Sequence, residues 1–336
     1  MKAMSSRDLV LAGDIGGTKT SLALFSVHGD KLHSEAMRTF PSKRYSGLVP
    51  VLQEFLAGNN SKFAAACFGI AGPVVDGKVK TPNLPWMIDT AELRRAVKLD
   101  AVSLLNDLEA GAYGIFTLDD DEFYTLNEGT MRQAGNKALI AAGTGLGQAI
   151  LHDDGQHFHP LASEGGHGDF APRNELEIEL LRYLIKRFQH VSYERVVSGP
   201  GLFNVYQFFK ESQGLEEPQW LSERFAAAND ASAVVSQTAS AGEAEICIKS
   251  LDLFVSVYGA EAGNLALRAK SVRGLYIGGG IAPKILAKLK DGTFMRAFVD
   301  KGRYTNLLAA IPVQVVLNDQ AALRGAAYYA AFIAPA

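Results

Sequence analysis

Residues 13–20, GDIGGTKT, form the short glycine-rich stretch that decides the fold. The stretch approaches the Walker phosphate loop, G-x-x-x-x-G-K-[ST], because Lys19 and Thr20 occupy its last two places. The place before them is Thr18, where the Walker motif requires glycine. Asp14 would also repel a phosphate unless a metal ion, or water on that metal, lay between them. The stretch is therefore a different kind of Gly/Thr loop.

The segments on both sides of this loop have the pattern of strands. LVLAGDI (9–15) is apolar up to the glycines, and TSLALFSV (20–27) alternates in polarity. A turn at 28–30 then leads into a third expected strand, KLHSEAMRTF (31–40). Walker and dinucleotide loops instead lead from a strand into a helix whose N-terminus holds the phosphates. We therefore predict a β-hairpin at GDIGGTKT.

Helices and buried strands follow the expected hairpin in a mixed α/β order. Apolar residues recur at helical spacing in three segments, and two short apolar runs between them are typical of buried strands. The expected helices are 45–58, 89–98 and 107–116, and the expected strands are 63–72 and 101–106.

The strand, loop and strand pattern occurs a second time. KALIAAGTGLGQAILHDDG (137–155) has the same order of apolar strand, Gly/Thr loop, apolar strand and turn as the first hairpin. This internal duplication predicts two similar α/β lobes. A third glycine cluster, in GLYIGGGIAPKIL (274–286), follows a strand and precedes a helix with Pro283 in its first turn. None of the three clusters matches G-x-G-x-x-G, which disfavours a nicotinamide-dependent enzyme.

Composition restricts the class of protein. The chain has 336 residues, 48% of them hydrophobic and 21% charged, which is enough for two domains with their own cores. A net charge of −3 disfavours a nucleic-acid partner, and no run reaches the roughly 18–20 apolar residues of a membrane span. Cys67 and Cys247 lie far apart in sequence, which indicates two reduced thiols. We expect a soluble cytoplasmic enzyme.

The two Gly/Thr hairpins and the late GGG cluster resemble the phosphate-1, phosphate-2 and adenosine elements of the actin, Hsp70 and sugar kinase superfamily. The resemblance implies a two-lobed, ribonuclease H-like fold with duplicated mixed sheets around a central cleft. It also implies ATP and Mg²⁺, with Asp14 facing the metal through water. The alternative for any one loop is a simple tight turn. The implied nucleotide-binding residues are Gly16, Gly17, Thr18, Gly143, Thr144, Gly145, Gly278, Gly279 and Gly280.

Three further motifs supply groups suited to a sugar. LLNDLEA (104–110) places Asn106 and Asp107 between a strand and a helix, a common location for functional residues in open α/β sheets. SEGGHGDFAP (163–172) and YERVVSGPGL (193–202) supply two glutamates and a histidine, and a buried polyol needs each hydroxyl paired. Each residue has a structural alternative: Asp107 as a simple N-terminal helix acid, His167 as a loop histidine, and Glu194 on a solvated helix face.

These three motifs, with FGIAGPV (68–74) and NLPW (83–86), resemble the bacterial glucokinase family from about Leu9 to about Ala330. The resemblance implies transfer of the γ-phosphoryl group of ATP to the 6-hydroxyl of glucose, with lobes that close on a bound sugar. It implies lobes of residues 1–116 with 318–336 and of 117–317, and a homodimer. GHGDFAPRNE contains no cysteine, so the zinc of a related repressor and kinase family is not expected. The implied sugar ligands are Asn106, Asp107 (also the general base), Glu164, His167 and Glu194.

Three other functions are compared with this one. A sugar-responsive repressor needs a helix-turn-helix before the first hairpin, where only a few residues are available. A non-catalytic actin-like ATPase would keep the phosphate loops but has no need of EGGH or LLND. A kinase for another hexose or for an N-acetylated amino sugar fits the same motifs and stays open.

Overall fold

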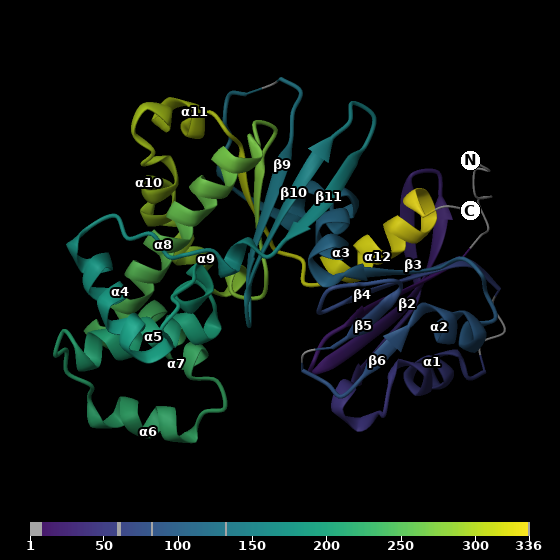
Figure 1. Ribbon diagram of the computed structural model, residues 1–336, viewed down its shortest axis with the longest axis horizontal. Coiled ribbons are helices and arrows are strands. Elements are labelled where there is room, and N and C mark those ends of the chain that lie inside the picture. Colours follow the sequence, from purple (N-terminus) through teal and green to yellow (C-terminus); the bar gives the residue numbers. More distant parts are fainter. Residues whose placement is uncertain (1–8, 59–61, 82, 132, 335–336) are drawn as a thin grey trace. The chain divides into compact units, whose positions relative to one another are not determined.

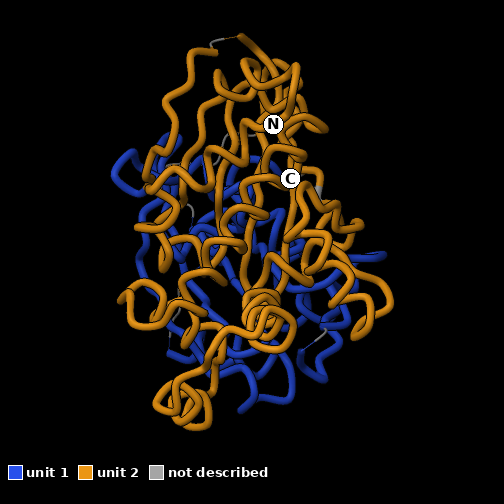
Figure 2. The backbone as a smooth tube through the Cα atoms, turned by 90° about the vertical axis from the view of Figure 1, so that its left-hand side faces the viewer, with its two compact units in different colours: residues 1–122, 318–336 blue, residues 123–317 orange. Residues whose placement is uncertain are grey.

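The computed structural model describes residues 9–58, 62–81, 83–131 and 133–334. These residues divide into two compact units, one from residues 1–122 and 318–336 and the other from 123–317 (Figure 2). The sequence analysis placed the first division after residue 116. The segment up to Glu122 belongs with the first unit because the Glu122 carboxylate accepts hydrogen bonds from Arg324 and Asn318 near the C-terminus.

The first unit is built on a mixed sheet. In the described residues its strand order is β3-β2-β1-β4-β7, with β1, β4 and β7 parallel and the β1–β2–β3 meander antiparallel. The central strands are almost wholly apolar because helices cover both faces. The edge strand β3 carries lysine, histidine, glutamate and arginine, which protect an exposed edge from pairing. The strands are β1 (Leu9–Ile15), β2 (Lys19–His28), β3 (Lys31–Pro41), β4 (Phe63–Ile70) and β7 (Val102–Asn106).

Two pairs of helices cover the two faces of this sheet (Figure 1). On one face lie α1 (Leu48–Leu56) and α2 (Thr90–Val97), near the short strands β5 (Lys78–Lys80) and β6 (Met87–Asp89). On the other lie α3 (Asp107–Gly114) and α12 (Ala321–Tyr328), which ends in a π-helical turn over Tyr329–Ile333.

The α3–α12 contact depends on glycine. A Cβ atom at Gly114 would clash with the Ala321 carbonyl oxygen, and one at Gly325 would clash with that of Ala110. Only glycine therefore allows the two helix backbones to approach this closely. The C-terminal helix in this way supports the helix that begins at Asp107.

The second unit repeats this topology with one added strand. In the described residues its order is β11-β10-β9-β12-β13-β8, with β9, β12 and β13 parallel and β9–β10–β11 an antiparallel meander. The predicted duplication of mixed sheets is thus confirmed. The strands are β8 (Phe123–Asn127), β9 (Lys137–Ala142), β10 (Leu146–Asp153), β11 (Phe158–Ser163), β12 (Leu275–Gly278) and β13 (Val313–Val316).

Helix α8 (Glu245–Ala269) runs through the core of this unit, and most of its apolar residues are buried. The segment after β12 differs from the sequence prediction, because Pro283 lies in a 3-10 turn, Ala282–Ile285, before the short helix α9 begins. The remaining helices are α4 (Glu175–Phe188), α5 (Gly199–Glu211), α6 (Gln219–Ala227), α7 (Ala231–Ser240), α9 (Leu286–Lys290), α10 (Thr293–Val299) and α11 (Thr305–Ala309). Within the described ranges, no helix is both long and apolar enough to cross a bilayer.

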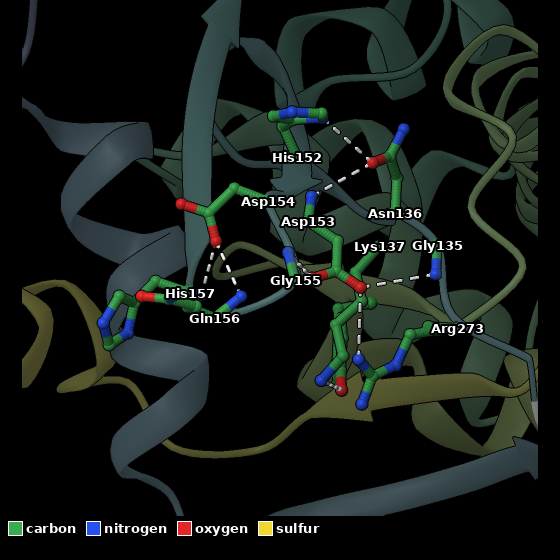
Figure 3. A network of polar contacts seen from close by, with 11 residues as sticks. Gly135, Asn136, Lys137, His152, Asp153, Asp154, Gly155, Gln156, His157 and Arg273 are labelled. Carbon is green, nitrogen blue, oxygen red and sulfur yellow. Dashed lines mark hydrogen bonds and ion pairs between the residues drawn. The ribbon is translucent and has the colours of Figure 1, made fainter.

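A polar network holds the end of β10 that lies away from the Gly/Thr turn (Figure 3). The Asn136 Oδ1 atom accepts from the Asp153 amide at 3.1 Å, and its Nδ2 atom donates to the Ala269 carbonyl at 2.9 Å. The Asp153 carboxylate accepts from the amide of Gly155 at 3.0 Å and pairs with Arg273 at 3.3 Å. The Gly155 hydrogen bond holds the pKa of Asp153 below its ordinary value. Asn136 thus joins β10 to the end of α8.

We expect Asn136→Ala to lower the free energy of unfolding by about 1–3 kcal/mol, because it leaves two backbone groups without partners. Urea denaturation provides the measurement. Gln156→Ala, at an exposed position in the neighbouring turn, is the control and should change stability by less than about 0.5 kcal/mol. Equal stability of the two variants would contradict the role given to Asn136.

Candidate active site

The carboxyl ends of β1, β4 and β7 bring the predicted acids of the first unit together. The strand register pairs Asp14 with Gly69 and pairs Ile70 with Asn106. Asp107 follows directly as the first residue of α3. Because parallel strands end at one edge of the sheet, residues distant in sequence meet there. The proximity of Asp14 and Asp107 is also seen in the electrostatic effect of Asp107 on Asp14.

The β1–β2 turn contains the predicted phosphate residues Gly16, Gly17 and Thr18. The Gly16 amide donates to the Lys19 carbonyl at 3.0 Å, which closes the turn. The buried Ser42 supports it from outside: its hydroxyl donates to the Gly16 carbonyl at 2.8 Å, and its amide donates to the Thr18 carbonyl at 3.0 Å. The sequence analysis missed Ser42, because no local pattern distinguishes it from other serines that follow a strand.

Asn106, and not Asp107, caps helix α3. The Asn106 Oδ1 atom accepts from the Leu108 amide at 2.9 Å, and the Glu109 carboxylate accepts from the Asn106 amide at 3.1 Å, which forms a capping box. The Asn106 Nδ2 atom donates to the Gly72 carbonyl at 3.1 Å. Asp107 follows the cap as an acid in the first turn of α3, and its carboxylate accepts from the Leu108 amide at 2.9 Å, so the structural alternative of an N-terminal helix acid is borne out.

Asp14 carries an unfavourable charge at neutral pH. Burial, the charge of Asp107 and to a lesser extent that of Asp319 together raise its pKa to about 6 against the opposing charge of Lys19. Lys19 itself lies 3.8 Å from the Asp319 carboxylate in an exposed ion pair. A strongly shifted pKa with a specific charge partner is typical of functional sites.

The second unit brings together the three predicted sugar residues that it contains. The His167 Nδ1 atom lies 3.9 Å from Oε1 of Glu194, and its Nε2 atom lies 3.9 Å from Oε2 of Glu164. The other oxygen of Glu194, Oε2, accepts from the Leu146 amide at 2.9 Å, directly after the β9–β10 turn. The Glu194 side chain is 27% exposed and lies in a 3-10 turn, so the alternative of a solvated helix face is wrong.

The glycines of EGGH allow the turn Gly165–His167 to lie against β10. A Cβ atom at Gly166 would clash with the Leu146 carbonyl oxygen, and one at Gly165 would lie 2.5 Å from the Gln148 amide oxygen. Gln148 in turn donates to the buried Glu261 of α8 at 2.8 Å. The sequence analysis missed Gln148 and Glu261, because their partners are distant in sequence.

Two of the three predicted glycine loops lie next to each other in the second unit. In the β9–β10 turn, Gly143–Thr144–Gly145, the Gly143 amide donates to the Gly145 carbonyl at 2.8 Å. The cluster 278–280 adjoins the same turn, since a Cβ atom at Gly279 would lie against the backbone of Ala142. Gly279 also has a φ of +82°. The amide of Gly199, at the start of α5, donates to the Gly143 carbonyl at 2.8 Å. The predicted phosphate-2 and adenosine loops are thus neighbours within one unit.

A duplicated mixed sheet with a Gly/Thr hairpin at the corresponding edge of each copy defines the actin-like ATPase fold.

Comparison with known proteins shows to which family the chain belongs. The family model for glucokinase matches residues 11–332. The chain is 44% identical to a glucokinase of Nostoc sp. strain PCC 7120, covering 96% of this chain and 99% of that protein. It is 41% identical to a glucokinase of Synechocystis sp., covering 96% and 97%. The crystal structure of a glucokinase from an Antarctic psychrotroph is similar with a TM-score of 0.84 and 33% identity over 96% of this chain and 98% of that one. The chain belongs to the glucokinase family and is a sugar kinase, a phosphotransferase.

The raised pKa of Asp14 predicts a pH-dependent stability difference. Above pH 6 the folded protein carries the unfavourable Asp14 charge, and below the unfolded pKa of 3.8 it does not. Asp14→Asn should therefore stabilise the ligand-free protein by about 1–3 kcal/mol at pH 7.5, and the gain should shrink as the pH falls and approach zero at about pH 3, below the unfolded pKa of 3.8. Denaturant unfolding at both pH values measures the difference. Asp121→Asn, at an exposed position, should show no such gain, and a gain independent of pH in Asp14→Asn would contradict the prediction.

Proposed function

We propose that this protein transfers the γ-phosphoryl group of ATP to the 6-hydroxyl of D-glucose, forming glucose 6-phosphate. The observation that carries the proposal is the cluster of Glu164, His167 and Glu194 beside a Gly/Thr hairpin, in a chain of the glucokinase family. Two carboxylates and an imidazole can pair with several hydroxyl groups of a buried sugar.

Asp107 acts as the general base in this proposal. Phosphoryl transfer passes through a loose transition state, so the carboxylate receives the hydroxyl proton late and does not ionise the alcohol beforehand. Its position at the start of α3 supports this role, since the amides at a helix N-terminus favour a charged carboxylate. Asn106 binds the sugar beside it. Although Leu108 and Gly72 each occupy one of its atoms, the amide group keeps a second N–H and a second lone pair.

The glycine loops bind ATP through their backbone amides. Gly16, Gly17 and Thr18 contact phosphate from the first hairpin, and Gly143, Thr144 and Gly145 contact it from the second. Gly278, Gly279 and Gly280 receive the adenosine. The neighbouring positions of the last two loops in the second unit support this assignment.

The residues around Asp14 suit a magnesium ion. A hard cation prefers carboxylate and water oxygens, and it would remove the cost that burial and Asp107 impose on the Asp14 charge. Asp14 would hold the ion through water. When bound with the nucleotide, the ion neutralises charge on the β- and γ-phosphates.

The role of Asp107 is tested by its isosteric variant. We expect Asp107→Asn to lower kcat by about 10²–10⁴-fold, because the base is lost. A non-hydrolysable ATP analogue should bind as in the parent, and stability should fall by no more than about 1 kcal/mol, the value of an acid at a helix N-terminus. Coupled ADP release, calorimetry and denaturation provide the measurements. Glu92→Gln, which removes a first-turn acid from α2, is the matched control and should keep the parent kcat. Near-normal turnover of Asp107→Asn would rule out the base.

Sugar selectivity tests the cluster in the second unit. A sugar altered where these residues bind leaves a charged group, shielded from water by the bound sugar, without a partner, at a cost of about 1.5–3 kcal/mol. We therefore expect kcat/KM for N-acetylglucosamine and galactose to be about ten- to a hundredfold or more below that for glucose. Glu164→Gln should raise the KM for glucose and leave the KM for ATP unchanged. Equal kcat/KM values for glucose and N-acetylglucosamine would favour a broad-specificity or amino-sugar kinase instead.

A further inference from the structure

The two carboxylate oxygens of Glu194 have different neighbours. Oε2 accepts from the Leu146 amide at 2.9 Å, at the end of the β9–β10 turn, whereas Oε1 faces Nδ1 of His167 at 3.9 Å. The backbone of Glu194 is held in place as well, since its carbonyl accepts from the Ser198 hydroxyl at 2.7 Å. One side chain thus contacts both the hairpin proposed to bind phosphate and the residues proposed to bind sugar.

Gly145 leaves the space that this carboxylate occupies. A Cβ atom at position 145 would lie 2.6 Å from Oε2 of Glu194, well inside van der Waals contact. At position 143, in the same turn, a Cβ atom would meet nothing within 4 Å. The two turn glycines therefore differ: a side chain at 145 would displace the Glu194 carboxylate, whereas one at 143 would leave it in place.

The segment that carries Glu194 is joined to both ends of the turn. Glu194 holds the Leu146 end, and five residues later the Gly199 amide donates to the Gly143 carbonyl at 2.8 Å. The bond from the Gly143 amide to the Gly145 carbonyl closes the turn between them. The Glu194 carboxylate is thus hydrogen-bonded directly to the Leu146 amide, and its Oε2 atom lies against Gly145 in the same turn.

From these contacts we infer that Glu194 is a positioning residue that couples sugar binding to nucleotide binding through Gly145 and Leu146. The inference rests on the proposed function and goes beyond it. A sugar hydroxyl that donates to Oε1 selects the carboxylate orientation in which Oε2 accepts from Leu146. That orientation holds the turn amides in place for phosphate, so glucose strengthens nucleotide binding, and by linkage the nucleotide strengthens glucose binding by the same factor.

Calorimetry with a non-hydrolysable ATP analogue, with and without saturating glucose, measures this coupling. In the parent protein we expect glucose to lower the Kd of the analogue by about 5–150-fold, the usual range of coupling between two sites. In Gly145→Ala, glucose should still bind, but it should change the Kd of the analogue by less than about twofold, because the added methyl group displaces the Glu194 carboxylate from Leu146. Gly143→Ala should keep the parent coupling factor, whatever its effect on the affinity for the analogue.

A second variant covers the case in which Gly145→Ala does not fold. Glu194→Asp keeps the charge but shortens the side chain by one methylene, so it cannot reach Leu146 and the sugar together, and the coupling should again fall to less than about twofold. An absence of coupling in an active parent would overturn the inference, as would full parent coupling in Gly145→Ala or in Glu194→Asp. Failure of the proposed function would appear separately, as a parent protein that releases no ADP in response to glucose.

Discussion

Parallel pairing of three central strands in each unit is the constraint on which the site depends. In the first unit, β1, β4 and β7 end at one edge, so the register places Asp14 beside Gly69, and Asn106 beside Ile70. In the second unit, β9, β12 and β13 have the same relation, and the glycines after β12 lie against the end of β9. Residues separated by about a hundred positions along the chain therefore meet through strand register, without any local sequence signal between them.

At these sheet edges, several close contacts between segments are possible only because glycine has no side chain. Gly69 lies against Ala110, where a Cβ atom would lie 2.7 Å from the alanine methyl group, so α3 can rest directly on β4. Gly145 makes room for the Glu194 carboxylate, and Gly166 does so for the Leu146 carbonyl. These glycines permit contact with a neighbour and are not needed for an unusual φ angle, which distinguishes them from Gly279. Alanine at such a position would displace that neighbour.

The sequence predicted what local patterns encode. Both hairpins, the duplication of mixed sheets and membership of the glucokinase family are confirmed, because alternating apolar residues and Gly/Thr loops are readable over ten to twenty positions. Ser42, Gln148 and Glu261 were missed, since their roles arise only when distant segments pack. Periodicity also could not show that Asn106, and not Asp107, is the N-cap residue of α3. The catalytic and binding roles of the site residues stay predictions.

The charges of two enclosed carboxylates, Glu261 and Asp14, are compensated to different extents by their neighbours. The wholly buried Glu261 receives hydrogen bonds from Gln148 and Asn264 and pairs with Arg268, so its charge is compensated by neighbours within its own unit. Asp14 is also largely enclosed, yet the charges that act on it include two carboxylates against a single ammonium group. A buried charge without such compensation costs stability, and the core of the unit has to offset that cost in the ligand-free protein. Under the proposed function, a bound cation would remove this cost, so the stability lost at Asp14 would contribute to the affinity for a metal–nucleotide complex.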